Sequence, residues 1–211
     1  MQVIAINGSP RARGNTNAAL ELMGARLGAE GIGFEIIQVG QERIRGCLSC
    51  GECGRRKDGK CVFDDDPVNG AVARMAAADG IVLASPVHYS GLAGAMKCFL
   101  DRAFVVAGAN GGLFRHKAGA ALVVLRRSGG SAALDGLYHY LAYAEMLLAT
   151  SSYWNIAHGS SPGELAGDAE GLQIVEVLAG NLAWLLKMRE LSRSSLPEPP
   201  AAAKVRTNFV R

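Results

Sequence analysis

The sequence lacks several features that define large functional classes. No run of apolar residues approaches the roughly 18 that are needed to cross a bilayer. The N-terminus also lacks the basic, apolar and small-residue order of a secretory leader. The formal net charge of +3 is small and scattered, which gives no support to a nucleic-acid partner. We therefore expect a cytoplasmic protein that binds neither a membrane nor a nucleic acid.

The opening segment also lacks the residues of a nucleotide-binding loop. No lysine lies between Met1 and Lys57, so the Gly-Lys-Ser/Thr ending of a nucleoside-triphosphate loop is absent. The glycine spacing of a dinucleotide fingerprint is missing as well. What the segment does contain is a β-branched run over residues 3–6, a polar turn and a helical pattern that begins near Asn15.

Such a junction between a strand and a helix binds anions, because free backbone N–H groups and the helix dipole point to the same place. A loop rich in hydroxyl and amide groups suits a single phosphomonoester, such as that of FMN. The candidate contacts in this loop are Ser9, Pro10, Arg11, Gly14, Asn15 and Thr16. The alternative is an ordinary strand-to-helix turn with Asn7 or Thr16 as the cap.

Strands and helices alternate along the chain. Strand-like runs cover residues 3–6, 34–39, 80–84, 118–125 and 153–158, and helical patterns cover residues 15–27, 67–78, 92–106, 132–148 and about 168–188. This alternation predicts an α/β fold with a parallel sheet covered on both faces. We expect a flavodoxin-like three-layer sandwich with a five-stranded parallel sheet in the order 2-1-3-4-5, and a ligand beyond the carboxyl ends of the strands.

The chain divides into one domain and a tail. Residues 1–190 are expected to form the FMN-binding domain, with a cysteine-rich loop over residues 46–66. Residues 191–211 are rich in Pro, Ser and Ala and are expected to form an extended C-terminal arm. The arm either packs on a neighbouring subunit or is free.

The third strand-like run ends in Ser-Pro-Val-His-Tyr-Ser-Gly over residues 85–91. This segment can offer backbone amides and an apolar or aromatic wall to a flavin ring. Its candidate contacts are Pro86, Val87, His88, Tyr89, Ser90 and Gly91. The alternatives are a packed surface aromatic for Tyr89 and a capping or solvent-facing side chain for His88.

Together these motifs resemble a known family. The matching segments are Gly8-Ser9-Pro10 with Gly14-Asn15-Thr16, and residues 85–89 with Lys97, Phe99, Asp101 and Arg102. Over roughly residues 1–160 the chain is similar to the NADPH-dependent FMN reductase family of flavodoxin-like proteins. The resemblance implies bound FMN and a homodimer or homotetramer.

The fourth strand-like run continues into a glycine-bearing loop over residues 126–131. In the family a loop at this place closes over the flavin, so the resemblance implies contacts from Arg127, Ser128, Gly129 and Gly130. A cation near the ring would favour the anionic reduced flavin. For Arg127 the alternative is a solvent-exposed position ahead of a helix cap. Asp101 and Arg102 are expected to anchor their helix or a subunit contact.

Four of the five cysteines fall in one short segment, at Cys47, Cys50, Cys53 and Cys61. A compact triplet followed by a more distant fourth cysteine suits a 4Fe-4S cluster, and basic residues over 55–60 would offset its negative charge. The pattern resembles the iron–sulfur flavoproteins, a branch of the same family. Zinc held by four thiolates, and free or disulfide-bonded thiols, are the alternatives.

Two further features have a structural interpretation. Asp64, Asp65 and Asp66 precede Pro67 and are expected to cap the next helix, because negative charge is favourable at a helix N-terminus. Cys98 lies inside a helical pattern and is expected to pack in the core.

The predicted function is that of an FMN-dependent oxidoreductase. It would relay electrons between a low-potential donor or NAD(P)H and an acceptor, through FMN and a 4Fe-4S cluster. The donor would be NAD(P)H or a ferredoxin-like protein, and the acceptor a small molecule or a protein. No catalytic side chain is predicted. The alternatives are a cluster-free NAD(P)H-dependent FMN or quinone reductase, a non-enzymatic flavin electron carrier, and a zinc-stapled interaction module.

Overall fold

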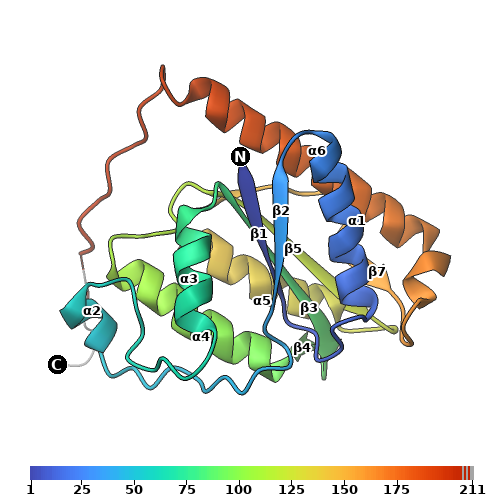
Figure 1. Ribbon diagram of the computed structural model, residues 1–211, viewed down its shortest axis with the longest axis horizontal. Coiled ribbons are helices and arrows are strands. Elements are labelled where there is room, and N and C mark those ends of the chain that lie inside the picture. The colour runs from blue at the N-terminus through green and yellow to red at the C-terminus, as the bar shows by residue number, and fades with distance from the viewer. Residues whose placement is uncertain (206, 208, 210–211) are drawn as a thin grey trace.

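A parallel β-sheet forms the middle layer of the protein in a computed structural model that describes residues 1–205, 207 and 209 (Figure 1). The strands are β1 Gln2–Asn7, β2 Gly33–Gln38, β3 Gly80–His88, β4 Gly91–Leu92, β5 Ala118–Leu125, β6 Leu147–Leu148 and β7 Ile156–His158. Their order is β2-β1-β3-β5-β6, with β7 also paired to β5. All these pairs are parallel except β3 with β4.

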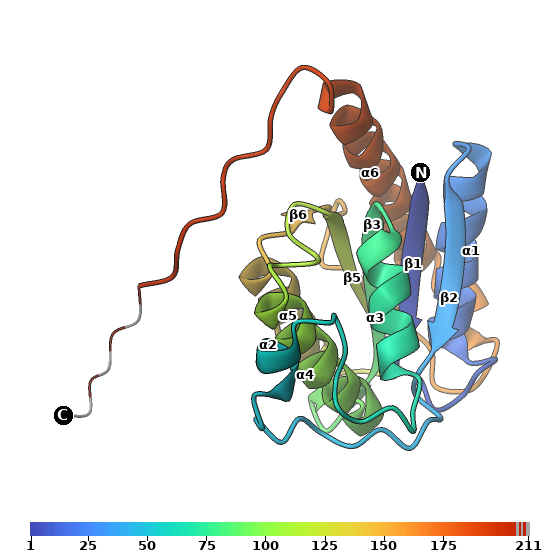
Figure 2. The same ribbon diagram turned by 60° about the vertical axis from the view of Figure 1, so that its left-hand side comes forward.

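Helices cover both faces of the sheet, as the two views show (Figures 1 and 2). Helices α1 Asn15–Ala29 and α6 Ala169–Ser192 pack on one face. Helices α3 Val68–Ala77, α4 Gly94–Ala109 and α5 Gly130–Tyr143 pack on the other. The short helix α2 Glu52–Arg56 lies against α4, and a 3-10 turn, η1 Glu164–Gly167, precedes α6. The predicted flavodoxin-like three-layer sandwich is confirmed.

The strands are apolar on both sides because each side faces a helix layer. In β1, Val3 and Ala5 join the core beneath α1 and α6, whereas Ile4 and Ile6 join the core beneath α3, α4 and α5. Strand β5 is buried along its whole length. Because β1, β3 and β5 are parallel, their carboxyl ends lie at the same edge of the sheet, where the loops that follow them meet.

The sheet has seven strands, so the prediction of five was wrong in number. Strand β4 arises because the chain reverses after β3 and pairs back on it. The fifth position is shared by β6 and β7, which pair with opposite ends of β5. The helix predicted over residues 132–148 ends at Tyr143, because the chain turns at Glu145, in the left-handed region with φ 56°, and Leu147 then enters the sheet.

Helix α6 and the segment after it form the C-terminal part of the described structure. By length and composition alone α6 could span a membrane, but its apolar residues, among them Val175, Leu178 and Leu182, are buried against the sheet and α1. The arm was predicted to begin at residue 191, but α6 continues to Ser192 and a turn follows over residues 193–196. From residue 197 the described chain is extended (Figure 2), and Glu198 in it pairs with His116 at 3.1 Å. Residues 206, 208, 210 and 211 of the predicted arm lie outside the described residues.

Candidate functional site

The turn from β1 to α1 has the features of an anion site. The Ser9 and Thr16 side chains are buried, with only 4% and 2% exposed. Helix α1 begins after Gly14, and no side chain among the described residues caps it. The first-turn amides and the positive end of the helix dipole are therefore left for a ligand. The ordinary-turn alternative required Asn7 or Thr16 to cap the helix, and neither does.

Two of the predicted phosphate contacts have structural partners of their own. The Asn15 amide donates to Ser161 O at 2.8 Å, and its oxygen accepts from Gly163 N at 3.1 Å. The Ser9 hydroxyl accepts from Arg11 N at 3.1 Å and donates to Arg11 O at 3.2 Å. These side chains hold the loop and dock it on the segment before η1. The Thr16 hydroxyl, the backbone amides and the Arg11 guanidinium, one nitrogen of which donates to Ser160 O at 2.8 Å, are then the donors available to a phosphate.

The phosphate loop is pressed against its neighbours at two glycines. A Cβ at Gly40, just after β2, would lie 2.1 Å from Ser9 O. A Cβ at Gly8 would lie 2.6 Å from Met96 Cβ of α4. Neither position has room for a side chain, so both glycines are needed for the backbone to approach this closely.

The second predicted loop is a tight hairpin. Strand β3 continues to His88, and the chain reverses at Tyr89 and Ser90, both in the left-handed region, with φ 51° and 60°. Such conformations are costly for non-glycine residues and cluster at functional sites. A Cβ at Gly129, where φ is 85°, would lie 2.7 Å from Ser90 Cα, so the third predicted loop touches the hairpin directly.

A cavity of about 270 Å³ lies between the first two loops. It brings together nine of the predicted flavin contacts: Ser9, Pro10, Arg11, Gly14, Asn15, Thr16, Pro86, Val87 and His88. The ends of β5 and of β7 complete it through Val124, Leu125, Arg126, Gly159 and Ser160. The cavity therefore lies at the carboxyl ends of the strands, where doubly wound sheets bind their ligands.

The remaining predicted contacts lie outside this cavity. Tyr89 is fully exposed at the tip of the hairpin, and Ser90 and Gly91 follow it in the turn and β4. Arg126 lines the cavity, whereas Arg127, Ser128, Gly129 and Gly130 do not. Their contribution to flavin binding stays a prediction.

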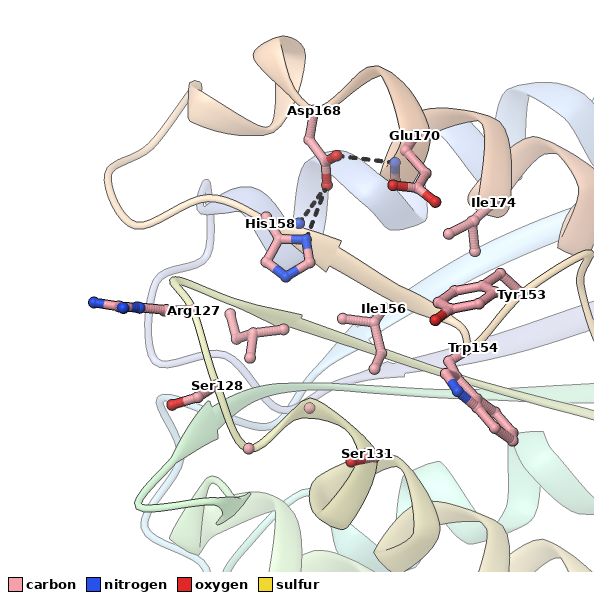
Figure 3. Close-up of a pocket in the computed structure, with 14 residues that line it drawn as sticks. Arg127, Ser128, Ser131, Tyr153, Trp154, Ile156, His158, Asp168, Glu170 and Ile174 are labelled. Carbon is pink, nitrogen blue, oxygen red and sulfur yellow. Dashed lines mark hydrogen bonds and ion pairs between the residues drawn. The ribbon is translucent and has the colours of Figure 1, made fainter.

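The third loop instead lines a neighbouring cavity of about 340 Å³ (Figure 3). One side of this cavity is apolar and aromatic, with Tyr153, Trp154 and Ile156. On the other side Asp168 accepts a hydrogen bond from the His158 backbone N–H at 2.6 Å and caps α6 through Gly171 N. Arg127 extends away from the cavity in Figure 3.

The cysteine loop is held in place by two asparagines. From α3, the Asn69 side chain accepts from Cys61 N at 2.7 Å and donates to Cys61 O and Phe63 O, both at 3.1 Å. From the end of α4, the Asn110 side chain donates to Cys53 O at 3.3 Å and accepts from Gly59 N at 2.9 Å. The helix layer thereby positions the backbone that carries the third and fourth cysteines.

Cys47, Cys50, Cys53 and Cys61 all line one small cavity of about 30 Å³. The five cysteines of the described chain are free thiols. Burial raises the pKa of the Cys53 thiol, and the neighbouring Cys61 and Cys47 add to the effect. No group of three or more His, Cys, Asp or Glu side chains in the described residues is arranged to hold a metal ion. The four thiols thus share a cavity without forming a ready-made ligand set.

One buried ion pair lies beside these thiols. Arg102 of α4 pairs with Asp66, with only 0% and 5% of their side chains exposed, and donates to Phe63 O at 2.9 Å. Burial lowers the pKa of the Arg102 guanidinium, but Asp66 and then Cys61 outweigh it, so the pKa is raised. Within the described residues the buried Arg102 Nε has no hydrogen-bond partner. An unmet buried donor costs about 1–3 kcal/mol.

The donor set and this unmatched N–H fit an iron–sulfur group. Thiolates are the ligands of such clusters, and N–H donors to their sulfurs are a known means of tuning them. The backbone N–H of Ser49 already lies 3.4 Å from Cys47 Sγ. Cys98 is only partly buried and packs at the edge of the core, and it does not line the four-thiol cavity.

Comparison with known proteins decides the family. The model of the NADPH-dependent FMN reductase family matches residues 1–161. The chain belongs to this family. An iron–sulfur flavoprotein of Methanocaldococcus jannaschii is 30% identical over 195 residues, which cover 89% of this chain and 98% of the relative. An iron–sulfur flavoprotein of Methanosarcina thermophila is 30% identical over 200 residues, covering 92% and 99%.

Solved structures agree with the fold. RosB with a bound flavin-derived intermediate, 8-demethyl-8-formylriboflavin-5'-phosphate, has a TM-score of 0.64 at 15% identity, over 100% of this chain and 94% of the other. An archaeal flavodoxin has a TM-score of 0.58 at 17% identity, over 89% and 99%. The predicted resemblance is therefore confirmed, and the chain is a flavin-dependent oxidoreductase of the FMN reductase family.

Several residues that build the sites were missed from the sequence. Gly40, Gly159 and Ser160 are distant in sequence from the phosphate loop that they touch, and they come next to it only when the sheet has assembled. Asn69 and Asn110 carry no motif. Asp66 was expected to cap α3 and does accept from Val68 N at 3.1 Å, but its second oxygen holds Arg102.

The expected charge compensation near the cysteines is also different. Arg55 and Arg56 pair with Glu52 and Asp58 on the exposed side of the loop. They were expected to offset the charge of a cluster, but solvent screens them there. The cation that lines the thiol cavity is Arg102.

Proposed function

We propose that this protein is an iron–sulfur flavoprotein that passes electrons between a donor and an acceptor through FMN and a 4Fe-4S cluster. The observation that carries the proposal is the shared cavity of Cys47, Cys50, Cys53 and Cys61, beside the buried Arg102. The names of the relatives, iron–sulfur flavoproteins over nearly their full lengths, support it. When bound, FMN exchanges two electrons and can release them singly, whereas a cluster moves one at a time.

For FMN, the chain would supply binding and orientation. The first-turn amides of α1 and the Thr16 hydroxyl would hold the phosphate, because negative charge is favourable at an uncapped helix N-terminus. Pro86, Val87 and His88 would form the edge of the ring site. No side chain is required to take part in covalent chemistry, which belongs to the cofactors.

For the cluster, the chain would supply four thiolates on a loop fixed by Asn69 and Asn110. Val105 and Val106 of α4 form the apolar wall of the thiol cavity, which would limit the access of water. The donor would be NAD(P)H or a ferredoxin-like protein, and the acceptor a small molecule or a protein. A reducing, cytoplasmic location is part of the proposal, since free thiols are kept reduced there.

Single cysteine variants test the ligand assignment. Cys47→Ser, Cys50→Ser, Cys53→Ser and Cys61→Ser, purified without oxygen, should each lose most of their iron and sulfide while retaining FMN. Cys98→Ser is the matched control and should keep both. Equal iron in all five variants, or zinc in place of iron in the wild type, would remove the cluster from the proposal.

The match to the NADPH-dependent FMN reductase family over residues 1–161 supports a second candidate, a cluster-free NAD(P)H-dependent FMN or quinone reductase. Such a protein would be yellow, free of iron and sulfide, and able to turn over NAD(P)H with a small acceptor. Reduction by a ferredoxin-like protein alone would instead favour a carrier.

We also propose that the chain forms a homodimer or homotetramer. Large apolar side chains are exposed around the end of the sheet that carries β6 and β7, including Leu147, Leu148, Tyr153 and Trp154. Exposed apolar patches of this kind mark interaction surfaces. Light scattering coupled to size exclusion tests the assembly, and a monomer at micromolar concentration would contradict it.

A further inference from the structure

The four-thiol cavity has one charged lining residue among those described, Arg102. Its guanidinium is fixed by three features: the Asp66 carboxylate, the Phe63 carbonyl at 2.9 Å, and the Phe63 ring, whose centroid lies 5.5 Å from Cζ. These contacts use the two terminal nitrogens. The third nitrogen, Nε, is buried and is without a partner within the described residues.

The Asp66 carboxylate fixes Arg102 and is itself fixed by Val68 N at 3.1 Å. A buried arginine held this firmly cannot turn its free N–H toward solvent, since its side chain is 0% exposed. Burying such a donor is unfavourable unless an acceptor reaches it. The cavity that Arg102 lines is also lined by Cys47, Cys50, Cys53 and Cys61, and thiolate or sulfide sulfur accepts N–H donors.

We propose that Arg102 sets the charge balance of the cysteine centre, by donating its Nε–H to sulfur of the bound cluster or its thiolates. This inference rests on the proposed cluster. Adding an electron makes the centre more negative, so a fixed cation and hydrogen-bond donor stabilise the reduced form more than the oxidised form. Arg102 therefore raises the reduction potential of the centre, and it acts as a positioning residue for the sulfur ligands.

The other cations of the loop offer a matched control. Arg55 pairs with Glu52 on the surface, with 71% of the Arg55 side chain exposed. Removing its charge changes the net charge of the chain by the same amount as removing Arg102. Solvent screens Arg55, and it does not line the cavity. An effect on the cysteine centre that depends on the position and hydrogen bonding of the cation will therefore be lost when Arg102 is replaced and kept when Arg55 is replaced.

The experiment is a redox titration, without oxygen, of the FMN-loaded full chain, followed by electron paramagnetic resonance of the reduced cluster. Arg102→Lys and Arg102→Gln should have a more negative midpoint potential than the wild type, and Arg55→Gln should match the wild type. Arg102→Lys keeps the charge and loses the Nε–H, so its shift should be smaller than that of Arg102→Gln. A wild-type potential in both Arg102 variants would overturn the inference and leave the proposed cluster standing.

Arg102→Gln leaves Asp66 as an uncompensated buried charge, and this alone can prevent folding. The double variant Arg102→Gln with Asp66→Asn removes both charges and keeps an acceptor for Val68 N. Its circular dichroism and FMN binding should match the wild type, and its cluster should release iron to a chelator several-fold faster. Release at the wild-type rate would overturn the inference. A wild type with neither iron nor sulfide would overturn the proposed function and the inference with it.

Discussion

The most informative single substitution at the proposed flavin site is Thr16→Ala. The Thr16 side chain is 2% exposed and lines the cavity at the N-terminus of α1. The structure places its hydroxyl among the few side-chain donors left for a phosphate, since Ser9 and Asn15 are engaged with neighbouring backbone. A hydrogen bond to a charged group contributes about 1.5–3 kcal/mol. Its loss should raise the FMN dissociation constant about 10- to 150-fold.

The assay is a titration of the FMN-free protein with FMN, followed by the quenching of flavin fluorescence. Thr16→Ser is the control, because it keeps the hydroxyl and should bind FMN within a few-fold of the wild type. Riboflavin, which has no phosphate, should bind equally to all three proteins. Equal FMN affinity of Thr16→Ala and Thr16→Ser would refute the assignment of the phosphate to this loop.

Three further predictions concern the surroundings of the two sites. Gly40→Ala, whose Cβ would clash with Ser9 O, should lower both the melting temperature and FMN affinity; unchanged values of both would contradict the close approach. Asn69→Ala removes three hydrogen bonds of the cysteine loop and should lower the free energy of unfolding by about 1–3 kcal/mol in urea. A smaller iron content without any loss of stability would show that Asn69 does not stabilise the loop. The pKa of Glu164 is lowered from 4.5 by the backbone N–H groups of the segment before η1, so the stability that the Glu164 carboxylate contributes is present above that pH and is lost as the pH falls below it. The difference in unfolding free energy between the wild type and Glu164→Gln should shrink over this acid range. A constant difference would show that these N–H groups do not lower the pKa.

The fold was predictable because its strongest signals are local. Continuous apolar runs such as that of β5 are typical of strands buried on both faces, and the helical patterns between them predict parallel crossovers. The errors arose where tertiary contacts decide the structure. Leu147 and Leu148 fit a helical pattern in sequence, but they pair with the start of β5 after a left-handed turn at Glu145.

The sites were predictable to a lesser degree. Loops that follow adjacent strands had to meet, so the cavity that joins Thr16 to His88 follows from the sheet order. The positions of Arg127 and Tyr89 depend on how each loop bends, and the spacing of residues in the sequence does not predict that bend. Arg102 was expected to anchor its helix or a subunit contact. That Arg102 lines the same cavity as the four cysteines, with its Nε lacking a partner within the described residues, depends on long-range packing between α4 and the cysteine loop.

We propose that one chain carries both a flavin and a cluster. FMN, iron, zinc and acid-labile sulfide, measured in one sample purified without oxygen, decide between the possibilities. We expect about one FMN, about four iron and about four sulfide per chain, and no zinc. One FMN without iron and sulfide would rule out the cluster, and a colourless protein that also fails to bind added FMN would rule out both cofactors.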